Sequence, residues 1–201
     1  MMRARLTASA MVITAALTLA ACGTTVNRIE VEEVRDLSGE WNDTDSRLVS
    51  EEMVADVISR PWITDFLAAN GHSPAVIVGE IRNLSHEHIN VGTFIGDIER
   101  ALINSGRVQF VASRTEREGI REERADQEIH ASERTRNEMG QEVGADFMLQ
   151  GSINTIVDAE GKRQVRYYQV DLTLTSLADN RKLWIGQKKI KKYIKRGNFR
   201  L

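Results

Sequence analysis

Cysteine, proline and aromatic residues are scarce in this chain of 201 residues. The single cysteine, Cys22, excludes an intramolecular disulfide framework and any zinc site built from several cysteines. Two prolines exclude a proline-rich spacer, and an aromatic content of 5% predicts a core of mainly aliphatic side chains. A basic excess is absent as well, because 27 Lys and Arg residues accompany 29 Asp and Glu residues. That balance argues against a dedicated nucleic-acid-binding protein.

Catalytic motifs are missing too. The sequence has no G-x-S-x-G, S-x-x-K or H-E-x-x-H motif and no phosphate-binding glycine loop. His86 and His88 have the spacing of metal ligands on a strand, but they fall in an apparent loop without a nearby third ligand, so we expect no metal there. Acidic residues are plentiful, which leaves a catalytic carboxylate pair open as an alternative. We expect a binding protein without catalytic residues, metal or cofactor.

The first 22 residues have the pattern of a lipoprotein signal. Arg3 and Arg5 precede an uncharged run over residues 6–21, which ends in Ala20-Ala21-Cys22 and is short for a membrane span. This resembles the bacterial lipobox, which implies that residues 1–21 are removed and that Cys22 is acylated, for example with palmitate. Two or three acyl chains make a stable anchor, because each buried methylene adds about 0.8 kcal/mol. An ordinary signal peptide with an incidental cysteine, or an uncleaved anchor, is the alternative.

We interpret residues 22–38 as an acylated tether and residues 39–201 as one globular domain. The tether is polar and acidic, and its sixteen residues after Cys22 reach roughly 55 Å when extended. The residue after Cys22 is Gly23 and not an aspartate, which resembles the pattern of Gram-negative lipoproteins that go to the outer membrane by default. The expected location is therefore the periplasmic side of the outer membrane.

Hydrophobic periodicity predicts an α/β or α+β domain with a small mixed sheet and helices on one side. The carboxyl half reads as an antiparallel meander, because its alternating strands are separated by short turns. Residues 80–90 read as a loop. Helices are expected over residues 43–58, 62–70, 94–103 and 114–144, and strands over residues 74–79, 108–111, 147–157, 165–177 and 183–190.

Charge is divided unequally along the chain. Residues 161–201 contain twelve basic and two acidic residues, whereas residues 22–160 contain thirteen basic and 27 acidic ones. Three interpretations of the lysine-rich stretch at 187–196 stay open. The lysines protect a sheet edge from aggregation, bind an acidic protein partner, or contact anionic lipid or cell-wall polymer.

Several separate stretches resemble the LpoB family, outer-membrane lipoprotein activators of class A penicillin-binding proteins. The stretches are Leu37–Arg47, Arg60–Trp62, Val78–Asn83, Thr93–Ile98 and Gly144–Ile153. The resemblance implies a fold similar to the amino-terminal domain of TolB. It also implies docking on a small accessory domain of a bifunctional synthase, which activates peptidoglycan synthesis and so affects cell shape. Enteric members carry a long proline-rich tether that is absent here, so the reach to an inner-membrane synthase is tight.

The docking surface is predicted from residue chemistry. Tyr and Arg are favoured interface anchors, so one candidate group lies on the meander and a second follows the first strand. The candidate residues are Arg166, Tyr167, Tyr168 and Gln169 in the first group and Arg82 and Asn83, with His86 and His88 beside them, in the second. We expect a monomer. The alternatives are an assembly lipoprotein related to CsgG-like secretion channels and a cell-wall hydrolase.

Overall fold

The computed structural model describes residues 25–197, so the predicted signal peptide and Cys22 lie outside the described part. From Arg35 onward the chain forms one compact unit, and residues 25–34 belong to a separate one. Among residues 25–197, no helix is both long enough and apolar enough to cross a membrane.

Two helices open the compact unit. Helix α2 (Asp43–Ser59) begins with a capping box, in which the Asn42 side chain accepts from the Asp45 N–H and the Asp45 carboxylate accepts from the Asn42 N–H. Helix α3 (Trp62–Asn70) follows directly and ends at Gly71, whose φ of 75° is the left-handed conformation that glycine adopts without steric cost. Both helices were predicted from the sequence, and both predictions are confirmed.

The sheet has five strands in the order β2-β1-β3-β4-β5 in the described part of the chain. Strand β1 pairs in parallel with β2 and β3, and the β3-β4-β5 half is antiparallel. The strands are β1 (Ala75–Leu84), β2 (Gln109–Phe110), β3 (Phe147–Glu160), β4 (Arg163–Ser176) and β5 (Lys182–Lys195). The predicted mixed sheet with a carboxyl-terminal meander is confirmed, and the fold is α+β.

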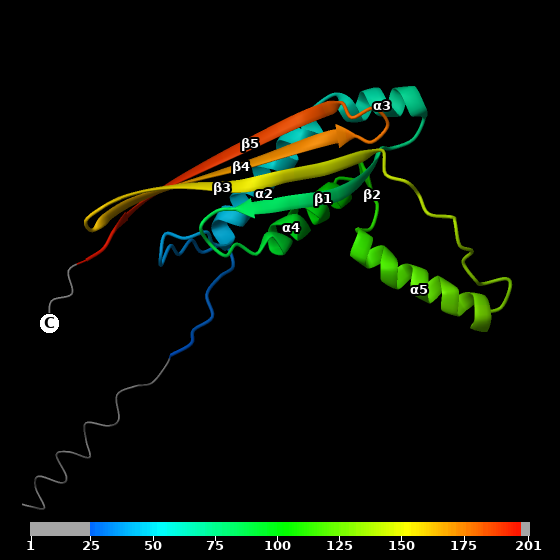
Figure 1. Ribbon diagram of the computed structural model, residues 1–201, viewed down its shortest axis with the longest axis horizontal. Coiled ribbons are helices and arrows are strands. Elements are labelled where there is room, and N and C mark those ends of the chain that lie inside the picture. The colour runs from blue at the N-terminus through cyan, green and yellow to red at the C-terminus, as the bar shows by residue number, and fades with distance from the viewer. Residues whose placement is uncertain (1–24, 198–201) are drawn as a thin grey trace, which may run out of the picture. The chain divides into compact units, whose positions relative to one another are not determined.

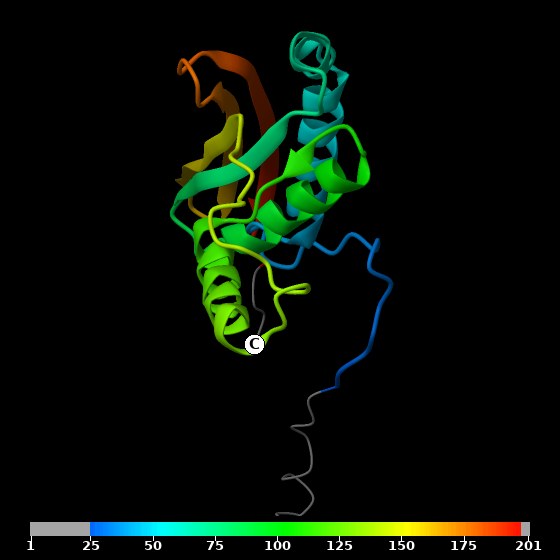
Figure 2. The same ribbon diagram turned by 90° about the vertical axis from the view of Figure 1, so that its right-hand side faces the viewer.

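Helices α2 and α4 (Val91–Asn104) cover one face of the sheet, as Figures 1 and 2 show from two sides. The core between them is aliphatic apart from a few aromatic rings. Val49 of α2 and Phe94 of α4 are completely buried against Ile153 of β3. In the described part of the chain, no helix lies over the opposite face of β1, β3, β4 and β5, and we call it the open face. Its side chains come from alternate positions of each strand.

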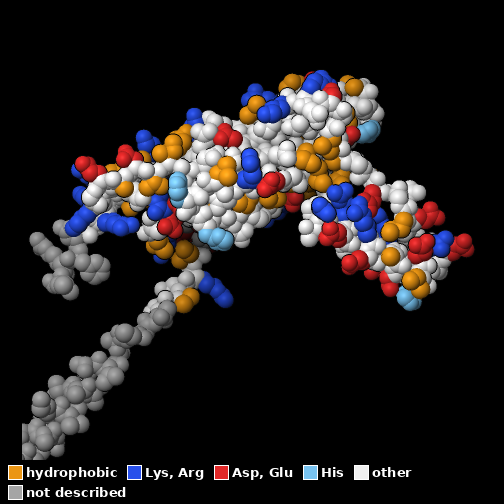
Figure 3. Space-filling view, viewed as in Figure 1, with side chains coloured by type: hydrophobic (Ala, Val, Ile, Leu, Met, Phe, Trp, Pro, Cys, Tyr) orange, Lys and Arg blue, Asp and Glu red, His pale blue; other side chains and the backbone are white. Residues whose placement is uncertain are grey.

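Helix α5 (Arg114–His130) connects β2 to β3 and has no buried residue. It begins with a capping box between Ser113 and Glu116, and both acidic and basic side chains decorate it (Figure 3). The helix is shorter than predicted, because the chain turns extended at Ala131. Arg121 and Arg124 then bind Glu142 of the returning segment at 2.8 and 3.2 Å.

Several strand boundaries also differ from the prediction, and strand β5 runs on to Lys195 instead of ending at residue 190. Strand β1 does not end at Gly79, because an irregularity between Val78 and Ile81 lets its pairing with β3 continue to Leu84. The segment assigned to a loop is therefore a strand up to Leu84. Strand β3 likewise runs through to Glu160, and the turn to β4 consists of Gly161, with a φ of 58°, and Lys162.

Candidate functional site

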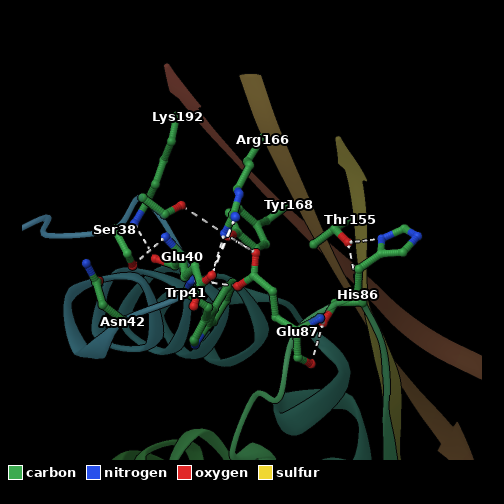
Figure 4. Close-up of polar contacts among 12 residues, drawn as sticks. Ser38, Glu40, Trp41, Asn42, His86, Glu87, Thr155, Arg166, Tyr168 and Lys192 are labelled. Atoms are coloured by element: carbon green, nitrogen blue, oxygen red, sulfur yellow. Dashed lines mark hydrogen bonds and ion pairs between the residues drawn. The ribbon is translucent and has the colours of Figure 1, made fainter. Parts of the chain in front are cut away.

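Glu87 gathers hydrogen-bond donors from distant parts of the chain (Figure 4). Its Oε1 accepts from the Tyr168 hydroxyl and from Arg166 Nη1, both at 2.7 Å. Its Oε2 accepts from the backbone N–H of Trp41 at 2.9 Å. Arg166 Nη1 also lies 3.4 Å from Glu40 Oε1. We call these five residues the clamp, because they fasten residues 40–41 and the loop after β1 to strand β4.

The centre of the clamp is shielded from water, whereas Glu40 at its rim is 55% exposed. The Arg166 and Glu87 side chains are 13% and 12% exposed, so salt screens their attraction much less than it screens a surface pair. Burial, and then the hydrogen bond to Glu87, raises the pKa of Tyr168 far above its ordinary value. Burial opposes the charge of Arg166, but its pKa is nevertheless raised by Tyr168, Glu87 and Glu40. At neutral pH the clamp therefore holds a neutral phenol beside a charged pair.

A second ionic contact ties the same segment to β5. Lys192 Nζ lies 2.8 Å from Asp36 Oδ1 and 2.7 Å from Asp45 Oδ2, and it donates to the Glu40 carbonyl at 3.1 Å. Its hydrogen bond is the main reason that the pKa of Asp36 is lowered. Burial opposes the charge of Lys192, but hydrogen bonds with Asp36 and Asp45 raise its pKa overall. Gly39 lies against Ile194 with a φ of 73°, where a Cβ would collide with the isoleucine.

Two predicted interface residues belong to the clamp. Tyr168 was predicted to contact a partner, but it is completely buried, and its ring packs edge-on against Trp41 with 5.5 Å between centroids. Strand β4 begins at Arg163, so Arg166 and Tyr168 share the inward face of Val170. Their burial follows the alternation of β4, whose inward face continues through polar side chains.

Three other candidates lie on the open face. Tyr167 and Gln169 alternate with the clamp residues along β4. Arg82 lies on β1 in register with Ser152 of β3. Ser152 pairs in turn with Asp171 of β4, which places Arg82 on the same face. The two groups predicted at 82–83 and 166–169 thus meet on one face through these residues. Asn83 does not join them, because its amide donates to the Glu87 carbonyl at 2.8 Å and orders the loop.

A row of hydrogen bonds organises the open face. The Tyr167 hydroxyl donates to Gln169 Oε1 at 3.1 Å, and Gln169 Nε2 donates to Asp171 Oδ2 at 2.8 Å. Gln187 of β5 donates to the other oxygen of Asp171 at 2.7 Å. These bonds restrict the rotamers of the row, so less side-chain entropy is lost when another surface binds there.

The histidine pair has no metal-site geometry. His86 Nδ1 lies 3.0 Å from the Thr155 hydroxyl, and both histidines are exposed. Among residues 25–197, no group of three or more His, Cys, Asp or Glu side chains could hold a metal ion.

Sequence reasoning missed Glu87, Glu40 and Lys192. Glu87 is separated by 81 residues from Tyr168, and Lys192 by 147 residues from Asp45, so no local spacing connects them. The only signal was Glu87 itself, an acidic residue between two histidines and shortly before Ile89, which is buried. Lys192 was hidden among neighbouring lysines.

The fold and surface define a small α+β domain that offers a broad, organised face. The sequence profile of the peptidoglycan-synthase activator LpoB family matches residues 45–190. The chain belongs to this family, which is one of regulators of peptidoglycan synthesis. A search of curated proteins gave no match.

Solved structures of similar proteins come from several bacteria. The LpoB C-terminal domain from Salmonella enterica is 17% identical, with 66% of this chain and 94% of that chain covered and a TM-score of 0.34. The solution structure of Escherichia coli LpoB is 14% identical, with 89% and 84% covered and a TM-score of 0.36. Lipoprotein GNA1162 from Neisseria meningitidis is 12% identical, with 63% and 88% covered and a TM-score of 0.39.

Proposed function

We propose that this protein is a lipid-anchored, non-catalytic activator that binds a bifunctional class A penicillin-binding protein and stimulates peptidoglycan synthesis. The observation that carries the proposal is membership of the LpoB family, whose profile spans nearly all of the folded domain. The secretion-channel alternative gains no support from this match. Activation requires that the protein bind the active conformation of the synthase more tightly than the inactive one.

The proposed anchor is Cys22. This proposal is supported by the pattern before the cysteine, in which Arg3 and Arg5 are followed by an uncharged run and then by small residues directly before Cys22. The proposed location is the periplasmic side of the outer membrane. Labelled palmitate should be incorporated into the full-length protein and not into a Cys22→Ser variant, and cell fractionation should find the labelled form in the outer membrane. Incorporation into both forms, or into neither, would contradict the anchor.

The proposed docking surface is the open face, including Arg82, Tyr167 and Gln169. It is supported by the convergence of residues from β1 and β4 on one uncovered sheet face and by the hydrogen-bonded row there. Arg166, Tyr168 and Asn83 support this surface from below, because the clamp and its loop fix the position of β4.

The test is a glycan polymerisation assay with the full-length protein in detergent and a purified class A synthase from the same organism. The wild-type protein should raise the polymerisation rate. Tyr167→Ala should weaken binding about tenfold, the equivalent of about 1.4 kcal/mol. Two arginine variants serve as a matched pair: Arg82→Ala on the open face and Arg100→Ala on α4, where the Arg100 side chain is 71% exposed. Only Arg82→Ala should reduce stimulation. Absence of both binding and stimulation by the wild type would refute the proposed function.

A further inference from the structure

The four lysines between residues 188 and 192 of β5 separate into two sets by the face on which they lie. Lys188 and Lys192 point to the helix side, where Lys188 pairs with Glu52 and Lys192 with Asp36 and Asp45. Lys189 and Lys191 alternate onto the open face and are exposed. Within residues 25–197 neither forms an ion pair. The fold thus pairs Lys188 and Lys192 with acidic side chains, whereas Lys189 and Lys191 keep their charges without an ion pair among the described residues.

In the described part of the chain, no acidic side chain, Asp158 of β3 included, forms an ion pair with either lysine. The two oxygens of Asp171 accept hydrogen bonds from the amides of Gln169 and Gln187, and Glu160 at the hairpin end pairs with Arg163 at 3.5 Å. Lys189 and Lys191 are two positions apart on one face, so they repel each other in the unbound protein. An acidic partner would relieve that repulsion.

An apolar and aromatic row lies directly beside the lysines. In the strand register Ile156 pairs with Tyr167, which pairs with Lys191, and Tyr193 pairs with Val165. Ile156 is 65% exposed and Tyr193 is 64% exposed. Figure 3 shows hydrophobic and basic side chains together over this end of the sheet. Edge protection by lysine accounts for charge on β5, but it does not account for large apolar side chains left uncovered next to it.

We infer that the β5 side of the open face, formed by Tyr167, Lys189, Lys191 and Tyr193, docks an acidic patch with apolar residues on a folded partner protein. The inference rests on the proposed function, since the synthase is the partner to be tested. Tyr167 and Tyr193 are the anchors that lose water on binding, and the two lysines accelerate association and select the charge of the partner.

A folded protein fits this surface better than a lipid bilayer or a wall polymer. Positive charge on the open face is interrupted: Lys189 and Lys191 lie on β5 and Arg82 on β1, while Asp171 lies on a strand between them and Asp158 and Glu160 lie at the end of the hairpin. A surface that is anionic throughout would meet these acids as well as the lysines. A folded domain can place its acidic residues opposite Lys189 and Lys191 alone.

The experiment measures association and dissociation rates between the full-length protein in detergent and the immobilised class A synthase at several salt concentrations. Lys189→Glu/Lys191→Glu should slow association about tenfold and flatten its salt dependence. The control is Arg114→Glu/Arg134→Glu, which makes the same charge change in α5 and the segment after it and should leave the rates nearly unchanged. Tyr193→Ala should mainly speed dissociation, and circular dichroism should show that all variants are folded.

The outcomes separate the inference from the proposed function. A wild-type protein that neither binds nor stimulates the synthase refutes the proposed function. A wild type that binds, with equal rates for the two double variants, overturns the inference and leaves the function intact. Two further results would overturn the inference. In the first, Lys189→Glu/Lys191→Glu still binds the synthase as the wild type does but no longer binds anionic phospholipid vesicles or purified peptidoglycan. In the second, sedimentation shows that this face joins two copies of the chain.

Discussion

Glu87 shows how one buried carboxylate can organise a surface it does not reach. It accepts hydrogen bonds from Tyr168, Arg166 and the Trp41 backbone, and it is 12% exposed. Tyr167 and Gln169 alternate with its partners on the same strand, so their positions on the open face depend on an ionic contact below the sheet. At this scale, stability and the docking surface depend on alternate residues of one strand.

Removing the acceptor should therefore cost more than removing one donor. Glu87→Ala leaves a charged arginine and a phenol without their partner, and we expect the free energy of unfolding to fall by about 3 kcal/mol. Tyr168→Phe keeps the Arg166–Glu87 pair and should lose about 1.5 kcal/mol. Urea unfolding followed by circular dichroism measures both, and equal losses would contradict the central role of the carboxylate.

Asp56 supplies a pH-dependent contribution to stability. Its pKa is lowered chiefly by a hydrogen bond from the Trp184 indole at 2.6 Å, with Arg60 adding to the effect and burial opposing it. A lowered folded-state pKa favours folding above the unfolded pKa of about 3.9, and this stabilisation disappears as the pH falls through the folded value. The difference in unfolding free energy between wild type and Asp56→Asn should thus be largest at pH 6 and shrink toward pH 3. A difference that stays constant over this range would contradict the assignment.

At the scale of elements, predictions succeed where burial follows a simple period. The alternation predicted for the carboxyl-half strands puts Val170, Leu172 and Leu174 on one face of β4, and all three are buried. The same period places Arg166 and Tyr168 on the inward face. Sequence does not reveal this, because both side chains are polar and their burial depends on contact with Glu87 from a distant loop. The continuation of β1 past Gly79 was missed for a related reason. Its pairing resumes after an irregularity that sequence alternation does not reveal.

Helix α5 is the element that the fold needs least. It has no buried residue, and Phe110 and Phe147 at the two ends of the connection both pair with Val76. These ends are thus two strand spacings apart, roughly 10 Å. Replacing residues 114–143 by an eight-residue Gly/Ser linker should change the free energy of unfolding by less than about 1 kcal/mol, as measured in urea. Loss of folding would show that α5 supports the core.

At the scale of the whole molecule, the question is where the tether stops and the domain begins. We predicted the boundary after residue 38, and it stays a prediction. Ionic contacts nevertheless reach back to Asp36, and residues 40–42 hold the clamp and the α2 cap. Thirteen residues then remain between Cys22 and Asp36, which span roughly 45 Å when extended.

Truncation tests this boundary. A fragment over residues 35–197 keeps every described contact of Asp36, Glu40 and Trp41, whereas a fragment over residues 43–197 loses them together with the Asn42 cap. The shorter fragment should be less stable by about 3 kcal/mol, from one helix cap and several hydrogen bonds. Fragments of equal stability in urea would place the boundary after residue 42.

The contacts of residues 36–42 also decide how the protein responds to force. If the acyl chains are held in one membrane and the synthase in another, tension reaches the Asp36–Lys192 contact before it reaches any strand. Peeling these seven residues from the sheet would lengthen the linkage by roughly 25 Å while the β3-β4-β5 ladder stays intact. Under the proposed lipid anchoring, the segment would then act as an extensible coupling that lets the protein follow changes in the width of the periplasm.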